Sequence, residues 1–181
     1  SIGKVAAPTQ PDAAGRIAGT FRDTGGKPQI VDLDYTLWSA PRPVMPVQRE
    51  QMHYDWHWQW AYGNGDIGNQ GVHQMDVARW LIPNATWPRS VLSLGGRFGY
   101  ADQGETPNSQ ITVMDYGETQ LVFEVRGLRT EQFHGQGVGN ILHFEAGVVA
   151  GELDAEMFGG CANVPPRYVV GGLVLLGGDG D

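Results

Sequence analysis

The sequence predicts an α+β domain in which one helix precedes a series of antiparallel strands. The clearest helical pattern lies at residues 66–82, and the main strand candidates follow it from residue 90 onward, two of them joined by a three-residue hairpin connection. With 27 Gly and 11 Pro among 181 residues, the composition favours many turns over long surface helices. A chain of this length fits one domain.

The N-terminal segment, residues 1–30, is predicted to be irregular, with one edge strand at residues 17–21, because it is polar and rich in Gly, Pro, Asp and Thr. Residues 31–38 mix apolar and polar positions without the clean two-residue alternation of a half-buried strand. Three prolines between residues 41 and 46 then exclude a helix and favour an extended loop. The folded domain, residues 31–150, is therefore expected to begin after this segment.

Residues 53–60 alternate between aromatic and polar side chains, which predicts an extended segment with two faces. The aromatic positions are Tyr54, Trp56, Trp58 and Trp60, and the polar positions are His53, Asp55, His57 and Gln59. Flat rings can cover the C–H faces of a sugar while polar groups bind its hydroxyls, so Tyr54 and Trp58 are predicted substrate-binding residues. The alternative is that these rings pack in the core beneath the sheet.

The helix predicted over residues 66–82 would carry a polar stripe, because Asp66, Asn69, His73 and Asp76 recur at spacings of three and four. His73 is the predicted general acid or base, since the ordinary pKa of histidine lies near neutrality. Asn69 can hydrogen-bond the imidazole or a substrate hydroxyl and is placed with His73 in the catalytic set. Asp66 and Asp76 are predicted to bind substrate. The competing interpretation is a polar face that is merely solvated.

Further strands are predicted at residues 90–98, 110–116 and 120–126, and a second hairpin joins residues 139–144 to 148–150. The last segment, residues 151–181, is rich in Gly, Ala and Val and shows no periodic pattern. It is expected to be a Gly-rich C-terminal tail.

Several classes of protein and site are disfavoured. A net charge of −8 with only 12 Lys and Arg gives no basic surface for nucleic acid. The longest apolar run, residues 168–176, is too short to cross a membrane, so a soluble protein is expected, cytoplasmic or periplasmic. One cysteine, Cys161, excludes an intrachain disulfide and a Cys-rich zinc site, and neither an HExxH metal motif nor a GxSxG nucleophile elbow is present. No metal site is predicted.

Residues 58–80, WQWAYGNGDIGNQGVHQMDVARW, resemble the start of the second, substrate-side domain of the Gfo/Idh/MocA oxidoreductases. On the family's glycine-rich motif fall Gly63, Gly65, Gly71 and His73. Residues 31–43 resemble a further family segment, and residues 94–100, 104–108 and 123–127 resemble one branch of the family, so the likeness covers about residues 30–147. Asn69 stands where many members have an aspartate, and Asn64 and Ala40 replace family glycines.

The resemblance implies an open, mostly antiparallel β-sheet with helices packed on one face, which mediates homo-oligomers. It also implies hydride transfer between a sugar or cyclitol hydroxyl carbon and the nicotinamide of NAD or NADP, with His73 sharing the acid and base work. The cofactor would be bound mainly by an N-terminal Rossmann domain that also supplies a catalytic lysine. Here no Gly-x-Gly-x-x-Gly opens a strand, turn and helix, and the only lysines are Lys4 and Lys27.

This chain is therefore expected to be the substrate half of a two-domain dehydrogenase and to be inactive alone, with Trp38 as the one candidate cofactor contact. Three alternatives stay open. The chain could be a non-catalytic carbohydrate-binding or oligomerisation domain, part of an NAD-dependent glycoside hydrolase of the same family, or a fragment that does not fold stably.

Overall fold

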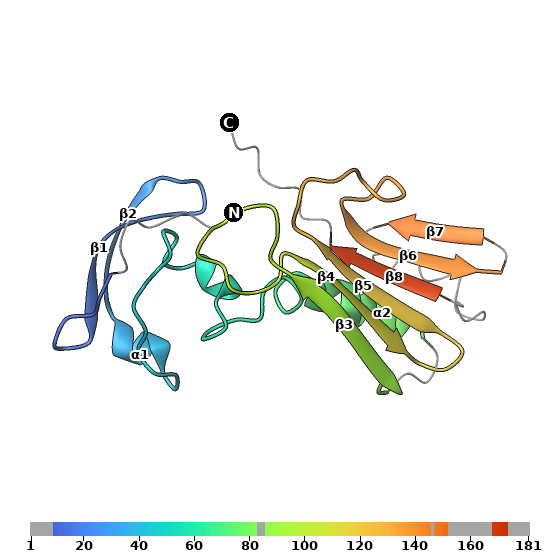
Figure 1. The fold of residues 1–181 in the computed structure, drawn as a ribbon, viewed down its shortest axis with the longest axis horizontal. Helices are drawn as coiled ribbons and strands as arrows, with labels where there is room; N and C mark the ends of the chain where they lie inside the picture. Colours follow the sequence, from blue (N-terminus) through green and yellow to red (C-terminus); the bar gives the residue numbers. More distant parts are fainter. Residues whose placement is uncertain (1–8, 83–85, 146, 152–167, 174–181) are drawn as a thin grey trace. The chain divides into compact units, whose positions relative to one another are not determined.

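The computed structural model describes residues 9–82, 86–145, 147–151 and 168–173, and these form two compact units (Figure 1). The first unit comprises residues 1–65 and 100–106, and the second comprises residues 66–99 and 107–181. The sequence pattern indicated one domain over residues 31–150, whereas the contacts divide the chain after Gly65.

The first unit begins with an antiparallel hairpin of β1, Arg16–Arg22, and β2, Pro28–Asp34. In the turn between them the Asp23 carboxylate accepts the backbone N–H groups of Gly25 and Lys27, each at 2.9 Å. The expected edge strand at residues 17–21 is present, but its partner β2 was not expected, and both strands occupy parts of the segment predicted to be irregular. The β2 pattern is indistinct because Val31 alone is buried in it.

A short helix, α1, Tyr35–Ser39, follows β2 directly. The Asp34 side chain caps it by accepting the Leu37 backbone N–H at 2.9 Å, which satisfies one of the free donors of the first turn. The core of this unit contains side chains from β1, β2, α1 and the following loop: Ile17, Phe21, Val31, Tyr35, Val47 and Met52, with Leu33 and Trp38 packed against them.

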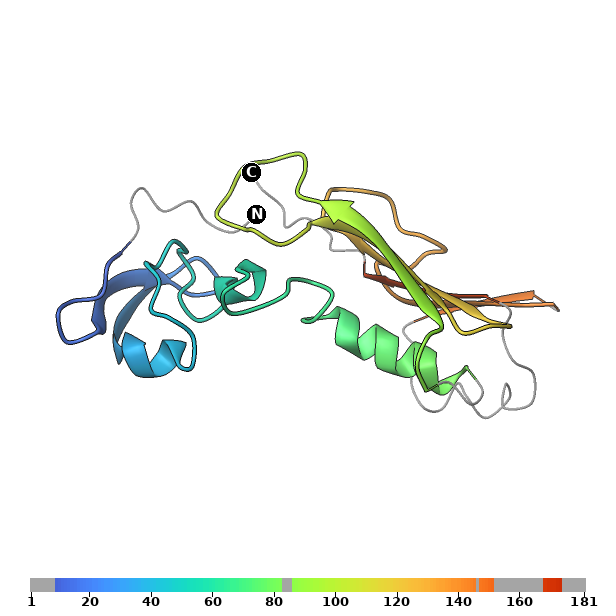
Figure 2. The ribbon, with the colours of Figure 1, turned by 60° about the horizontal axis from the view of Figure 1, so that its bottom comes forward.

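The second unit is an α+β layer in which helix α2, Gly71–Trp80, packs on one face of a six-stranded sheet (Figure 2). The strand order is β3-β4-β5-β8-β6-β7. The strands are β3 Ser90–Gly96, β4 Ser109–Asp115, β5 Gln120–Arg126, β6 Val138–Phe144, β7 Gly147–Gly151 and β8 Tyr168–Leu173. All neighbouring pairs are antiparallel except β5 and β8. The predicted open, mostly antiparallel sheet with a helix on one face is confirmed.

Strand β8 lies within the segment expected to be a Gly-rich tail. It pairs in parallel with β5 and antiparallel with β6, so it stands inside the sheet. Two glycines at its centre interrupt any alternation of side chains, and that is why the sequence pattern did not indicate it. Cys161 lies outside the described residues.

Residues from α2 and the sheet share the core of the second unit: Ala78, Ile82, Met114, Leu121, Phe123, Val125 and Leu142. The helix was expected from about residue 66 but begins at Gly71, because residues 66–70 form turns. Neither helix in the described part of the chain is long and apolar enough to cross a membrane.

Candidate functional site

The aromatic segment of the first unit is a turn followed by a short 3-10 helix, η1, Asp55–Trp58, and the predicted extended conformation is wrong. Side chains bond to nearby backbone groups and close these turns. The Gln51 N–H donates to the Asp55 carboxylate at 3.1 Å, and the Trp56 indole N–H donates to the His53 carbonyl at 3.1 Å. Such local bonds compete with strand pairing, so an alternating pattern can fold as turns.

In and just before η1, aromatic and histidine rings contact one another and are not separated onto two faces. The His57 imidazole stacks on Trp56, with ring centroids 3.8 Å apart, and its Nδ1–H donates to the Tyr54 carbonyl at 2.5 Å. The Tyr54 ring lies 5.2 Å from His57 and 5.4 Å from Trp58. This cluster fixes where the following residues, 59–64, leave the helix.

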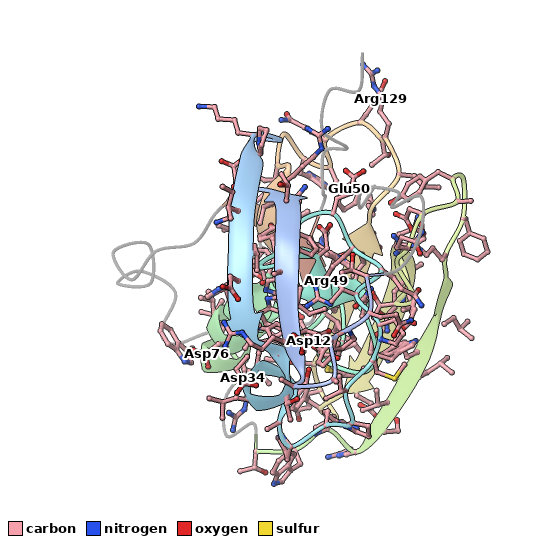
Figure 3. The ribbon with its side chains drawn as sticks, turned by 90° about the vertical axis from the view of Figure 1, so that its left-hand side faces the viewer. Asp12, Asp34, Arg49, Glu50, Asp76 and Arg129 are labelled. Carbon is pink, nitrogen blue, oxygen red and sulfur yellow. The ribbon has the colours of Figure 1, made fainter. Side chains whose placement is uncertain are left out.

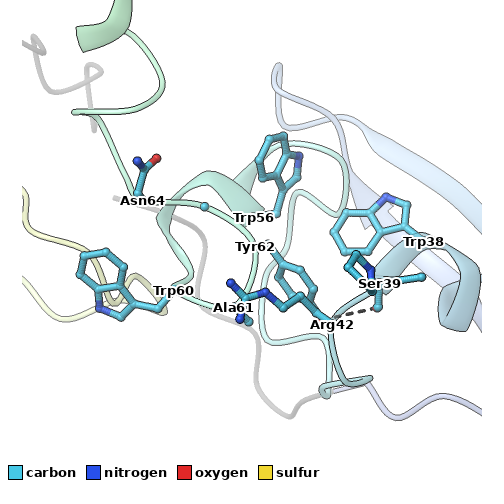
Figure 4. Close-up of a pocket in the computed structure, with 11 residues that line it drawn as sticks. Trp38, Ser39, Arg42, Trp56, Trp60, Ala61, Tyr62 and Asn64 are labelled. Carbon is cyan, nitrogen blue, oxygen red and sulfur yellow. Dashed lines mark hydrogen bonds between the residues drawn. The ribbon is translucent and has the colours of Figure 1, made fainter.

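A pocket of about 660 Å³ lies beside this segment, within the first unit (Figure 4). Its lining comes from the end of α1, the loop after it, and the residues around η1: Trp38, Ser39, Ala40, Pro41, Arg42, Trp56, Trp60, Ala61, Tyr62, Gly63 and Asn64. Four large aromatic rings therefore face one space. A pocket of this size and composition suits a small ligand with flat apolar faces.

The rings of Trp38, Trp56, Trp60 and Tyr62 form the aromatic wall of the pocket, and hydrogen bonds hold its Trp60 end in place. The Trp60 N–H donates to the Glu105 carboxylate at 2.8 Å, and the Glu105 N–H donates to the Trp58 carbonyl at 2.8 Å. The Trp60 ring remains 56% exposed, so it is accessible to a ligand. Loop 100–106 thus supports the wall from a distant part of the sequence.

Two motif glycines permit this local path of the chain. A Cβ at Gly63 would lie 2.5 Å from the His57 carbonyl oxygen. Gly65 has φ +76°, and a Cβ there would lie 2.6 Å from the Thr106 hydroxyl. The glycine motif is therefore explained by close backbone packing on η1 and on loop 100–106.

A buried cation, Arg49, which is labelled in Figure 3, contacts two rings of the aromatic wall. Arg49 is fully buried, and its guanidinium carbon is 4.8 Å from the Trp38 ring centroid and 5.4 Å from that of Tyr62. Its Nε donates to the Met52 carbonyl at 3.0 Å and its Nη1 to the Gln59 side-chain oxygen at 3.2 Å. Among the described residues Nη2 has no hydrogen-bond partner. The two rings thus stabilise the cation through their π faces.

The interior of this unit also perturbs two acidic groups. Burial raises the pKa of Asp55 to about 6, although the hydrogen bond from Gln51 and the charge of Arg49 oppose the shift. Burial, together with the hydrogen bond between the Tyr35 and Tyr62 hydroxyls at 3.1 Å, raises the pKa of Tyr35. The Tyr35 hydroxyl is therefore protonated at neutral pH.

The predicted polar stripe does not form. Because α2 begins at Gly71, Asp66 and Asn69 precede the helix, while His73 and Asp76 lie on it. Asp66 is buried, with its backbone carbonyl accepting the Gly71 N–H at 2.8 Å, whereas the side chains of His73 and Asp76 are exposed. The four side chains therefore do not share one exposed helical face, and the correction follows from the later start of the helix.

The predicted binding residues and the pocket overlap only in part. Trp38 lines the pocket, but Tyr54 and Trp58 belong to the ring cluster of η1 and do not line it. Arg42, Ser39 and Tyr62 also line the pocket and were not predicted from the sequence. The one available signal was a Trp, an Arg and three prolines close together at residues 38–46, a composition typical of a rigid loop.

The described residues do not fit a dinucleotide cradle or a metal centre. A dinucleotide-binding turn joins a strand to a helix, but here η1 and a loop precede the glycines at 63–68. Throughout the described ranges there is no group of three His, Cys, Asp or Glu side chains suited to a metal ion. The aromatic pocket of the first unit is therefore the candidate site.

Comparison with known families matches residues 23–131, more than half of the chain, to the Gfo/Idh/MocA C-terminal domain. No match was found among curated proteins or among solved structures. The matched range includes all the residues of the pocket and the sheet as far as β5. The chain therefore belongs to the Gfo/Idh/MocA family of oxidoreductases, as a C-terminal, substrate-side domain.

Proposed function

We propose that this chain binds the substrate of an NAD(P)-dependent oxidoreductase that transfers hydride between nicotinamide and a hydroxyl-bearing carbon of a sugar or cyclitol. The observation that carries the proposal is the aromatic pocket of the first unit. Family membership supports the reaction class. The cofactor is assigned to a part of the enzyme other than the residues described, since these lack a dinucleotide cradle.

The pocket offers both kinds of contact that a sugar needs. The rings of Trp38, Trp56 and Trp60 would cover the C–H faces. Hydroxyl groups of the ligand would bond to Ser39, Tyr62 and Asn64. The Ser39 and Tyr62 hydroxyls already lie 3.5 Å apart, so one ligand oxygen could reach both.

A titration of the full chain tests the binding role. Glucose and myo-inositol should quench tryptophan fluorescence saturably, and Trp60→Ala should weaken that binding about tenfold, because one stacking face is lost. Trp87→Ala is the control, since Trp87 is 86% exposed and does not line the pocket. Absence of quenching with a folded protein, or equal effects of the two variants, would refute the role.

For the chemical step we assign to His73 the transfer of the substrate hydroxyl proton and to Asn69 a hydrogen bond that supports it. The imidazole is exposed in the first turn of α2, and histidine is the side chain that most often serves as a general acid or base. In an enzyme that carries this chain with a dinucleotide-binding domain, His73→Ala should lower kcat about 100-fold or more while sugar affinity stays nearly constant. If kcat is retained, His73 is not the acid or base.

We also propose that the sheet face opposite α2 binds a second copy of the chain. Leu92, Leu94 and Ile111 are each more than half exposed on this face, and Leu94 pairs with Ile111 across β3 and β4. Met114, three residues after Ile111, packs in the core with Ala78 of α2, so the exposed side chains lie on the other face.

Light scattering coupled to size exclusion tests this interface. The wild-type chain should elute as an oligomer, and Leu92→Lys with Leu94→Lys should give monomers, because two charges would enter an apolar contact. Ile30→Lys, at an 87% exposed position on β2, is the control and should leave the mass unchanged. A monomeric wild-type chain would exclude the interface.

A further inference from the structure

Building on the sugar-binding role proposed above, we infer that the pocket selects a sugar that carries a carboxylate, such as a uronic or aldonic acid, and that Arg42 binds that carboxylate. The inference rests on the charges in and behind the pocket wall, which the aromatic lining alone does not explain.

Arg42 is the single charged side chain among the 11 residues that line the pocket. Figure 4 shows its guanidinium directed toward the part of the pocket lined by Ala61 and Tyr62. Its backbone N–H donates to the Ser39 carbonyl at 2.9 Å, and Pro41 and Pro43 restrict the chain on either side. The base of the side chain is therefore fixed relative to the pocket.

The guanidinium of Arg42 makes no hydrogen bond or ion pair with any residue that the structure describes. No aspartate or glutamate lines the pocket to neutralise it. A planar guanidinium fork matches the two oxygens of a carboxylate and binds them with paired hydrogen bonds. The pocket thus offers an uncommitted cationic fork beside flat apolar walls.

A second cation strengthens the positive potential from behind the wall. The rings of Trp38 and Tyr62, which line the pocket, also contact the buried guanidinium of Arg49. The hydrogen-bond acceptors of Arg49 are neutral, the Met52 carbonyl and the Gln59 amide. Two carboxylates lie behind the lining without belonging to it: Asp55 interacts with Arg49 electrostatically, and Glu105 accepts the Trp60 backbone N–H at 2.8 Å. One arginine therefore lies in the pocket lining and a second contacts the lining rings, whereas no carboxylate belongs to the lining.

This local charge contrasts with the charge of the whole chain. A net charge of −8 repels anions in general, so a positive pocket is not the by-product of a basic surface. A carboxylate fits better than a phosphate, because one fork serves two oxygens and the lining contains no second charged side chain to serve a third.

Titrations followed by tryptophan fluorescence test the inference on the full chain. The probes are glucuronate, its neutral methyl ester, glucose and glucose 6-phosphate. Glucuronate should bind about tenfold or more tightly than glucose or the ester, and its affinity should fall as salt is added. Arg42→Gln should reduce the ratio of glucuronate affinity to glucose affinity from about tenfold or more to about one. Arg129→Gln, an exposed arginine outside the pocket, is the matched control.

The outcomes separate this inference from the proposed function. Equal affinities for glucuronate and glucose, or a preference that survives Arg42→Gln, would overturn the carboxylate site and leave sugar binding intact. Tighter binding of glucose 6-phosphate than of glucuronate would overturn the carboxylate as the group recognised. If no probe binds although the chain is folded, both the inference and the sugar-binding role fail.

Discussion

The interior of the first unit raises the pKa of one carboxyl group, that of Asp55. The carboxyl is almost fully buried, and it accepts one backbone hydrogen bond while it lies within the field of a buried arginine. Burial outweighs these two stabilising contacts, since the pKa rises from 3.8 to about 6. The folded protein therefore holds this proton at pH values where the unfolded chain has released it.

The first prediction concerns the pH dependence of stability. Because the pKa of Asp55 is higher in the folded state, the free energy of unfolding should fall as pH rises from about 4 to about 6 and then level off, with a total change of up to about 3 kcal/mol. Asp55→Asn should remove this component. Urea titrations of both proteins at several pH values measure it. Curves that stay parallel across the window would contradict the assignment.

Individual site residues were only partly predictable from the sequence. The aromatic segment and Trp38, which were singled out in the sequence, lie in the region where the pocket is found. Arg42 and Arg49 were not found, because nothing in a local pattern shows which charged side chain a fold places beside a pocket or buries against rings. Both positions depend on contacts between residues far apart in the sequence.

At the level of elements, helix α2 meets the sheet through a glycine. A Cβ on Gly71 would lie 2.5 Å from the Phe123 ring, which is fully buried in β5. The first turn of α2 can approach the sheet this closely because the residue has no side chain. The same residue belongs to the glycine motif that indicated the family.

The second prediction follows from this contact. Gly71→Ala should destabilise the second unit by about 1–3 kcal/mol, because the buried Phe123 ring must shift to admit the methyl group. Phe123→Leu should remove much of the clash, so the double variant should be more stable than the sum of the single effects predicts. Thermal unfolding of the four proteins measures the coupling. Strictly additive effects would show that the ring does not limit this position.

The strands illustrate what sequence patterns can and cannot show. β5 has the bounds expected, and β3, β4, β6 and β7 differ from expectation by at most two residues at either end, since each has an alternating or apolar run bounded by turn residues. β2 and β8 were missed, and η1 was mistaken for an extended segment. In β8 two glycines interrupt the periodic pattern, in β2 only Val31 is buried, and in η1 side chains bond to nearby backbone groups.

At the scale of the molecule, each unit has its own hydrophobic core. Ile17 is buried in the first, among residues from β1, β2 and α1, while Leu121 is buried in the second with α2 and the sheet. The α+β class could be predicted from the order of elements along the chain. The division into two units could not, because loop 100–106 joins the first unit from within the second one's sequence range.

The third prediction uses this division. Ile17→Ala and Leu121→Ala should each cost about 2–5 kcal/mol, because each leaves a cavity in a closely packed core. Hydrogen exchange should show Ile17→Ala lowering protection in β1 and β2 and Leu121→Ala lowering it in β4, β5 and α2. Uniform loss of protection over the whole chain with either variant would mean that the two cores unfold as one.

The position of β8 affects how the sheet is assembled during synthesis. β5 and β6 are translated before the strand that joins them, and each has an open hydrogen-bonding edge until residues 168–173 leave the ribosome. Until β8 is synthesised, the sheet has two unpaired strand edges, and these can form hydrogen bonds with other chains. Closing the sheet requires pairing between β5 and β8, which are far apart in the sequence, and such pairing generally forms slowly and leaves strand edges exposed to aggregation.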